Sequence, residues 1–86
     1  MNYFPLLLNI EYKTAVVVGG GHVARQKVEA LLPAKANIIV VSPEVTTELQ
    51  AYIDQNLITW RQKAFEPADL DDAALVFAVT DKTEVN

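Results

Sequence analysis

Short runs of apolar, β-branched residues alternate along this chain with stretches of helical periodicity. The clearest runs are Thr14–Val18, Asn37–Val41 and residues 75–80. The first run ends at three glycines and is typical of a strand buried on both faces of a parallel sheet, and the second predicts another buried strand. Residues 75–80 predict the next fully apolar strand. A shorter stretch around Trp60, residues 59–62, predicts a further strand at an edge of that sheet.

The segments between these runs predict helices. Residues 23–32 carry apolar side chains at close to the helical period, and Pro33 ends the pattern. Ser42-Pro43-Glu44 reads as an N-cap, a proline at the first helical position and an acid in the first turn, so a second helix is expected over residues 43–55. Residues 65–70 are expected to form a turn or short helix. This order predicts an α/β fold of the Rossmann type, with a doubly wound parallel sheet and right-handed crossovers.

The two ends of the chain carry further expectations. Residues 3–10 precede the first strand and should pack along the sheet rather than form its centre. Asp81 stands where it could cap a further helix, with Glu84 three residues later as in a capping box. We therefore expect residues 1–86 to form one domain, the N-terminal part of a longer enzyme, with its sheet truncated on the C-terminal side.

Composition narrows the classes of function. The chain of 86 residues is 51% hydrophobic and 21% charged, which suits one folded domain. It has no cysteine, so disulfides, thiolate metal sites and a cysteine nucleophile are excluded, and a cytoplasmic location is expected. The net charge of −4 argues against a nucleic-acid partner. No export signal is recognisable, and no apolar run approaches the roughly 20 residues that span a bilayer, so no membrane association is expected.

The strongest chemical signal is a glycine cluster between the first strand and the first helix. Residues 19–24, GGGHVA, match the dinucleotide-binding pattern G-x-G-x-x-A in that context. Gly19 would permit the tight turn, Gly21 would let a pyrophosphate approach the backbone, and Ala24 would let the helix pack closely on the strand. The N-terminus of the helix would then hold the diphosphate without a lysine. The weaker alternative is a glycine cluster that only turns the chain.

The remaining candidates concern the ribose and the far end of the cofactor. The ribose-binding acid of such folds normally ends the second strand, where this chain has Ser42. Either Ser42 and the loop backbone hold the ribose, or Glu44 reaches back, and because no arginine stands nearby, NAD is favoured over NADP. Thr80 and Asp81 end the last strand at the ligand-binding edge of the sheet, so they could form a loop over the cofactor or cap a helix.

Other conspicuous side chains fit structural roles. His22, the one histidine, has no neighbouring ligands in the pattern and predicts neither a metal site nor a catalytic base. Trp60, Phe65 and Phe77 fit core packing better than base stacking. The charges at Arg25, Lys27 and Glu29 are most simply the solvated face of the first helix, although the two basic side chains could attract an anionic substrate.

The sequence resembles the N-terminal domain of siroheme synthases, a family comprising precorrin-2 dehydrogenase and sirohydrochlorin ferrochelatase. The resemblance covers essentially the whole chain and is carried, in order, by Phe4-Pro5-Leu6, Val17-Val18-Gly19-Gly20-Gly21 with Val23-Ala24, Lys27, Val41-Ser42-Pro43, Phe65-Glu66, Ala78-Val79-Thr80-Asp81 and Val85-Asn86. It implies an NAD-dependent oxidation of the tetrapyrrole precorrin-2 to sirohydrochlorin, sometimes followed by iron insertion, in a parent protein that is a homodimer.

The resemblance also implies site residues. Gly21, His22 and Val23 would contact the cofactor diphosphate, Pro43 and Glu44 would lie by the adenosine ribose, and Thr80 and Asp81 would face the nicotinamide. The aspartate implicated in catalysis in this family lies beyond Asn86, so the fragment alone is expected to be inactive. One departure is Ala34-Lys35, where the family commonly has Ala-Gly, so the turn after the first helix could be built differently.

Other functions stay open at this point. Another Rossmann dehydrogenase would need a different catalytic module after residue 86. A non-enzymatic, NAD-sensing regulatory domain would usually carry an acid at the position of Ser42. A folded fragment that binds nothing is the third alternative.

Overall fold

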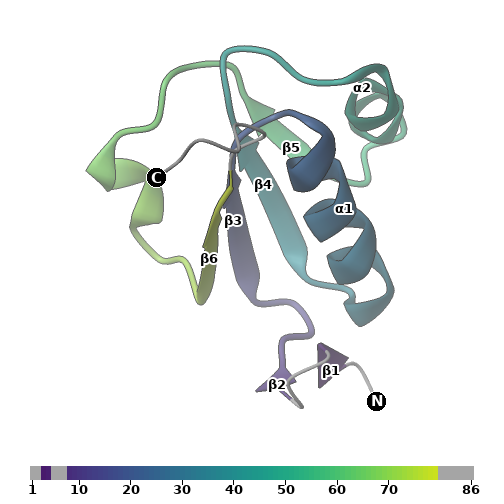
Figure 1. Cartoon of the computed structure of the whole chain (residues 1–86). Coiled ribbons are helices and arrows are strands. Elements are labelled where there is room, and N and C mark those ends of the chain that lie inside the picture. Colours follow the sequence, from purple (N-terminus) through teal and green to yellow (C-terminus); the bar gives the residue numbers. More distant parts are fainter. Residues whose placement is uncertain (1–2, 5–7, 80–86) are drawn as a thin grey trace.

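The computed structural model describes residues 3–4 and 8–79, and its centre is a four-stranded parallel sheet (Figure 1). The strands run in the order β5-β4-β3-β6 across the sheet. Their bounds are β3 (Thr14–Val18), β4 (Asn37–Val41), β5 (Thr59–Arg61) and β6 (Leu75–Ala78). All four expected strands are confirmed, with β5 at an edge as predicted. The part of the last strand expected at residue 80 lies outside the described residues.

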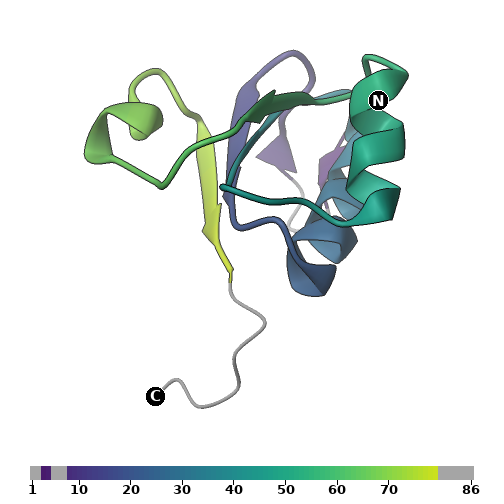
Figure 2. The same ribbon diagram turned by 90° about the horizontal axis from the view of Figure 1, so that it is seen from above.

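Helices α1 (His22–Leu31) and α2 (Thr47–Asp54) connect successive strands and cover the same side of the sheet (Figure 2). The short 3₁₀ helix η1 (Leu32–Ala34) follows α1, and η2 (Pro67–Leu70) lies on the other side of the sheet. The chain moves from β3 to β4 to β5 in one direction and then returns past them to β6. Because crossovers between parallel strands are right-handed, the connection from β5 back to β6 must run over the opposite face of the sheet from α1 and α2, and η2 lies on that face. This is the Rossmann-type α/β fold expected from the sequence.

The core lies between the sheet and the two helices. Its buried residues are Ile10, Ala15, Val17, Ala24, Val28, Leu31, Ala34, Ile38, Val40, Leu49 and Ile58. Alternate residues of a strand point to opposite faces of the sheet. Val16 and Val41 lie outside the core cluster, and each is only 1% exposed, so the second face of these strands is also covered. The two central strands are therefore buried on both faces, which explains their unbroken apolar runs.

The turn after α1 keeps a left-handed backbone without glycine. Pro33 lies within η1, so the helix ends where the proline predicted. Lys35 then adopts φ 61° and ψ 31°, the conformation that glycine occupies most easily. The backbone N–H of Tyr12 donates to the Lys35 carbonyl oxygen at 3.0 Å, which joins this turn to the entry of β3. The substitution of lysine for glycine thus leaves a left-handed turn under some strain.

The second helix begins later than predicted. Its N-cap is Thr46, whose Oγ1 accepts a hydrogen bond from the Leu49 N–H at 3.1 Å, and Glu48 supplies the acid of the first turn. The prediction that Ser42 caps this helix and that Pro43 and Glu44 begin it was wrong. Thr46 carries the same capping signal, and residues 42–46 form a loop without helical structure instead.

The remaining sequence expectations give mixed results. The described part of residues 3–10 does not form the centre of the main sheet, as expected: β1 (Tyr3–Phe4) and β2 (Leu8–Asn9) form a separate antiparallel pair near the start of β3 (Figure 1). Trp60 and Phe77 pack against the core, but Phe65 is 40% exposed, so its assignment to the core was wrong. The expected cap at Asp81 lies outside the described residues.

The crossover to β6 is held by a buried carboxylate. Asp69 is 6% exposed and accepts hydrogen bonds from Lys63 Nζ at 2.5 Å, Arg61 Nη1 at 3.1 Å and the Glu66 N–H at 2.8 Å. These donors, led by Lys63, hold the pKa of Asp69 below its usual value. Because two cations from the end of β5 meet on one acid of η2, the connection is fixed relative to the sheet.

Candidate functional site

The glycine loop leaves β3 at the carboxyl edge of the sheet, and Gly19 makes the turn. Its φ is +126°, and a Cβ on it would lie 2.7 Å from the Val79 carbonyl oxygen. Both observations require glycine, because a side chain would be strained and would collide with backbone. The Gly19 N–H donates to the Val41 carbonyl oxygen at 2.9 Å, which holds the turn against β4. The predicted role of Gly19 in the tight turn agrees with this geometry.

Gly20 brings the glycine loop into direct contact with the loop of residues 42–46. A Cβ on Gly20 would lie 1.9 Å from the Glu44 carbonyl oxygen and 2.6 Å from Ser42 Oγ. The Thr46 N–H donates to the Gly20 carbonyl oxygen at 2.9 Å. The two loops are thus in van der Waals contact on one side of Gly20 and hydrogen-bonded at its carbonyl.

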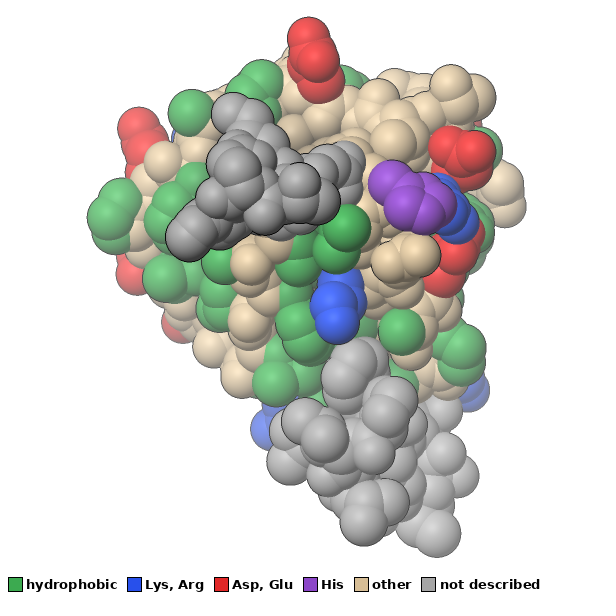
Figure 3. Space-filling view, viewed as in Figure 1, with side chains coloured by type: hydrophobic (Ala, Val, Ile, Leu, Met, Phe, Trp, Pro, Cys, Tyr) green, Lys and Arg blue, Asp and Glu red, His purple; other side chains and the backbone are tan. Residues whose placement is uncertain are grey.

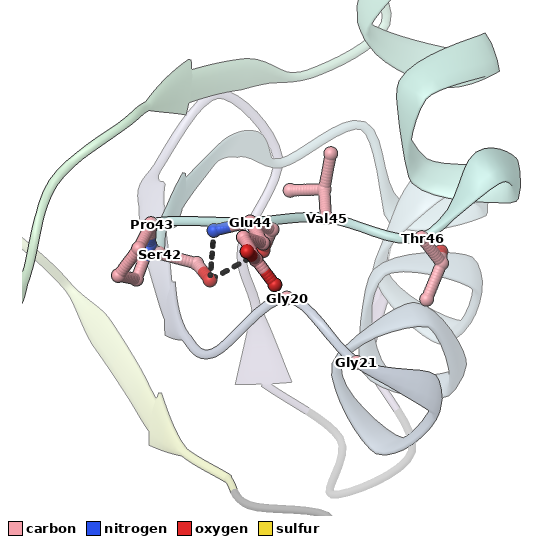
Figure 4. Close-up of a pocket in the computed structure, with 7 residues that line it drawn as sticks. All are labelled: Gly20, Gly21, Ser42, Pro43, Glu44, Val45 and Thr46. Carbon is pink, nitrogen blue, oxygen red and sulfur yellow. Dashed lines mark hydrogen bonds between the residues drawn. The ribbon is translucent and has the colours of Figure 1, made fainter.

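Residues 42–44 form a tight turn closed by the Ser42 side chain (Figure 4). Ser42 Oγ donates to the Glu44 carbonyl oxygen at 2.5 Å and accepts from the Glu44 N–H at 3.3 Å. The Trp60 indole N–H donates to the Ser42 carbonyl oxygen at 2.9 Å, and Ser42 is only 7% exposed. The hydroxyl is therefore engaged within the loop, whereas the side chain of Glu44 is exposed.

An open hollow of about 400 Å³ lies between these two loops, within the usual size range of small-ligand sites. It is lined by Gly20, Gly21, Ser42, Pro43, Glu44, Val45 and Thr46 (Figure 4). Gly21 is also the N-cap residue of α1, so the first turn has no side-chain cap, and no acidic side chain lies in that turn. The N-terminal end of a helix with these features favours an anion.

The hollow brings together some of the predicted site residues and includes others that were not predicted. Gly21, Ser42, Pro43 and Glu44 were expected and all line it. Sequence reasoning missed Gly20, Val45 and Thr46; the third consecutive glycine and the capping threonine were the available signals. Gly19 forms the turn before the hollow but does not line it. His22 and Val23 begin α1 and do not line the hollow either. Thr80 and Asp81 lie outside the described residues.

The polar face of α1 is organised rather than simply solvated. His22 is exposed, and its ring Nδ1 lies 2.8 Å from Arg25 Nη2; the chain's histidine is visible beside basic and acidic side chains in Figure 3. Arg25 Nη1 donates to Glu29 Oε1 at 2.9 Å, and the Tyr52 hydroxyl donates to Glu29 Oε2 at 2.8 Å. The hydrogen bond from Tyr52, helped by Arg25, lowers the pKa of Glu29. This chain of contacts joins α1 to α2.

Lys27 also has a contact within the fold. Its Nζ lies 5.7 Å from the centre of the Phe77 ring on β6, a cation–π distance. Arg25, Lys27 and Glu29 are partly exposed, as a solvated face implies, and each also makes a contact within the fold. Among residues 3–4 and 8–79, no group of His, Cys, Asp and Glu side chains is placed to hold a metal ion. In the same part of the chain, no helix has the length and apolar character needed to cross a bilayer.

Comparison with protein families agrees with this geometry. A family described as "Putative NAD(P)-binding" matches residues 6–86. The chain belongs to this NAD(P)-binding family. The matched range includes the glycine loop, the 42–46 loop and the hollow between them. Family membership therefore supports NAD(P) as the class of ligand for this site.

Known relatives confirm the resemblance to the siroheme synthase N-terminal domain. A siroheme synthase of Xylella fastidiosa (strain M12) is 48% identical over 84 residues, 96% of this chain and 18% of the relative. A siroheme synthase of Baumannia cicadellinicola subsp. Homalodisca coagulata is 42% identical over 86 residues, all of this chain and 19% of the relative. The chain thus spans about a fifth of the length of these relatives.

A solved structure gives the same result for the fold. The protein named "SirC, precorrin-2 dehydrogenase" superposes with a TM-score of 0.83 at 25% identity, over 87% of this chain and 38% of that one. The strand order and the helices on the sheet are those of a Rossmann-type domain. The fold class expected from the sequence is confirmed.

Proposed function

We propose that this chain binds NAD and is the cofactor-binding part of a dehydrogenase of siroheme biosynthesis that oxidises precorrin-2 to sirohydrochlorin. The observation that carries the proposal is the hollow between the glycine loop and residues 42–46, at the carboxyl edge of the parallel sheet. Ligands of doubly wound folds bind at that edge. Similarity to siroheme synthases and to a precorrin-2 dehydrogenase supports the reaction and the tetrapyrrole substrate.

The residues of the hollow fit the parts of a dinucleotide. The diphosphate would lie on Gly21 and the first turn of α1, where His22 and Val23 begin the helix and Gly19 shapes the turn. The adenosine ribose would lie by Pro43 and Glu44. When bound, NAD supplies the acceptor for the hydride of the substrate. The protein's part is to hold the dinucleotide in a fixed orientation.

The same residues favour NAD over NADP. The Glu44 side chain is exposed at the hollow, and neither lysine nor arginine is among the lining residues. A carboxylate can accept hydrogen bonds from the ribose hydroxyls but repels a 2′-phosphate, which normally needs an arginine. Since the Ser42 hydroxyl is engaged with Glu44, we assign the ribose contact to Glu44 and the loop backbone, with Ser42 in support.

Further parts of the proposal rest on the resemblance. By this resemblance, Thr80 and Asp81 would face the nicotinamide, and none of the 86 residues would supply the catalytic aspartate. The parent enzyme is a cytoplasmic homodimer that could also insert iron into sirohydrochlorin. We therefore expect the 86-residue chain to bind NAD without oxidising precorrin-2. Turnover of precorrin-2 by the purified chain would contradict this assignment of the catalytic group.

The test is a calorimetric titration of the folded chain with NAD and with NADP. We expect NAD to bind with a Kd between about 1 μM and 1 mM and NADP to bind more weakly. Gly21→Asp adds a negative charge and a side chain where the diphosphate would lie, so it should abolish binding. Asn56→Asp, which adds the same charge at an exposed turn after α2, should leave binding unchanged. A folded wild-type chain that binds neither nucleotide would refute the proposal.

A further inference from the structure

The dinucleotide fingerprint leaves its second position open, and in this chain that position is Gly20. The structure makes it the most restricted position of the loop. A Cβ on Gly20 would come within 1.9 Å of the Glu44 carbonyl oxygen and 2.9 Å of the Glu44 carbonyl carbon. Both are backbone atoms, so no rotation of a side chain could relieve the collision. Alanine at position 20 would therefore push the 42–46 loop away from the glycine loop.

The carbonyl of the same residue holds the other end of that loop. The Thr46 N–H donates to the Gly20 carbonyl oxygen at 2.9 Å, one residue before α2 begins. Glu44 in turn is fixed by Ser42, whose Oγ bonds both the carbonyl oxygen and the N–H of Glu44. A single residue thus sets the distance between the loop that ends in the α1 N-terminus and the loop that carries Glu44.

We propose that Gly20 is a positioning residue for the nucleotide. Its missing side chain and its carbonyl keep the ribose side of the hollow at a fixed spacing from the diphosphate side. A dinucleotide must contact both sides at once, so a change in this spacing weakens its binding even when each loop keeps its own conformation. This inference rests on the proposed binding of NAD.

The first test compares the wild-type chain with Gly20→Ala by calorimetric titration, at a temperature where circular dichroism shows both to be folded. We expect NAD to bind Gly20→Ala at least about tenfold more weakly. Because Glu44 is displaced, the NAD-to-NADP affinity ratio should fall as well. A general loss of stability would leave that ratio unchanged in the folded protein. A folded Gly20→Ala chain that binds NAD like the wild type would overturn the inference.

A second pair of variants tests the hydrogen bond and remains informative if Gly20→Ala does not fold. Thr46→Ala removes the hydroxyl that caps α2 but keeps the N–H, whereas Thr46→Pro removes both. The φ of Thr46 is −70°, which suits proline. Because both variants lack the hydroxyl and differ in the N–H, we expect Thr46→Pro to bind NAD about three- to tenfold more weakly than Thr46→Ala. Equal affinities in the two variants would refute the positioning role.

The two proposals fail in different ways. If the wild-type chain binds no nucleotide, the proposed function is wrong and the inference falls with it. If the wild type binds NAD but Gly20→Ala and Thr46→Pro bind it equally well, the proposed function stands and the positioning role of Gly20 is wrong.

Discussion

Enlarging Ala24 should loosen the contact between α1 and the sheet. Ala24 is 1% exposed and belongs to the core cluster, in the first turns of the helix that begins at Gly21. Its small side chain lets the helix lie close to the sheet, which keeps the N-terminus of α1 beside the hollow. Leucine at this position adds three heavy atoms where the surrounding residues leave almost no space. We therefore expect Ala24→Leu to destabilise the fold.

The expected magnitude follows from overpacking. Forcing a larger side chain into a filled core costs about 1–3 kcal/mol, whereas the intrinsic helix propensities of alanine and leucine differ by only a few tenths of a kcal/mol. A domain of 86 residues has a total stability of about 4–13 kcal/mol, so the variant should still fold. At this size, each kcal/mol shifts Tm by about 4–8 °C, which predicts a decrease of roughly 5–20 °C.

Thermal unfolding followed by circular dichroism measures the effect, and Ala30→Leu is the matched control. Ala30 is exposed on the same helix, so the same substitution there should shift Tm by no more than about 4 °C. In calorimetry, Ala24→Leu should also bind NAD more weakly than Ala30→Leu, because the first turn of α1 moves. If the two variants had equal Tm values, the close packing inferred at Ala24 would be incorrect.

Three further predictions concern other parts of the fold. Lys35→Gly should raise stability by about 0.5–1 kcal/mol in chemical denaturation, because φ is 61° at that position; a loss would contradict the inferred strain. The low pKa of Asp69 gives stability that is present above its unfolded-state pKa and is lost as the pH falls through its lower folded-state pKa. The Tm advantage of the wild type over Asp69→Asn should therefore be largest near neutral pH and shrink below about pH 4; a constant difference would argue against the ionised contact with Lys63. Tyr52→Phe removes the main cause of the low pKa of Glu29, so an NMR titration should find that pKa closer to its usual value, and an unchanged pKa would exclude the hydrogen bond.

The central fold could be predicted because its signals are local. β3 and β4 are buried on both faces, so every residue after Thr14 and Asn37 in these strands is apolar, and the pattern can be recognised without knowing the neighbouring strands. Gly19 was identifiable for a similar reason, since its φ of +126° at the end of a strand is a conformation that residues with a side chain rarely adopt. The structure at such positions is determined by residues that are close in sequence.

The start of α2 was missed because two capping signals compete. Ser42-Pro43-Glu44 and Thr46-Thr47-Glu48 each place a hydroxyl side chain ahead of an acid, and local propensity does not rank them. The choice is made by contacts far apart in sequence. The Thr46 N–H is held by the Gly20 carbonyl, and the Ser42 carbonyl accepts from Trp60, so the loop is extended across the glycines before a helix can begin.

The exposed apolar residues are a second case in which the sequence alone does not determine the outcome. Phe65 and Val76 are 40% and 43% exposed, and Figure 3 shows hydrophobic side chains at the surface over β6 and η2. Sequence hydrophobicity predicts burial for both, since it carries no information on which strand ends at an edge of the described sheet. Val76 lies on β6, whose one neighbour in the described sheet is β3, so its side chain has fewer elements to pack against.

Gly20 shows that a sequence motif can leave a position unrestricted although the structure restricts it. The fingerprint assigns roles to the glycines that meet the ligand or turn the chain, and it leaves open a position whose constraint comes from another loop. Here that constraint is the Glu44 carbonyl oxygen, 24 residues away in sequence and 1.9 Å from where a Cβ would lie. Relatives that place a larger residue at this position must therefore differ in the path of the loop after β4. Where that path differs, the spacing between the ribose and diphosphate sides of the site should differ with it.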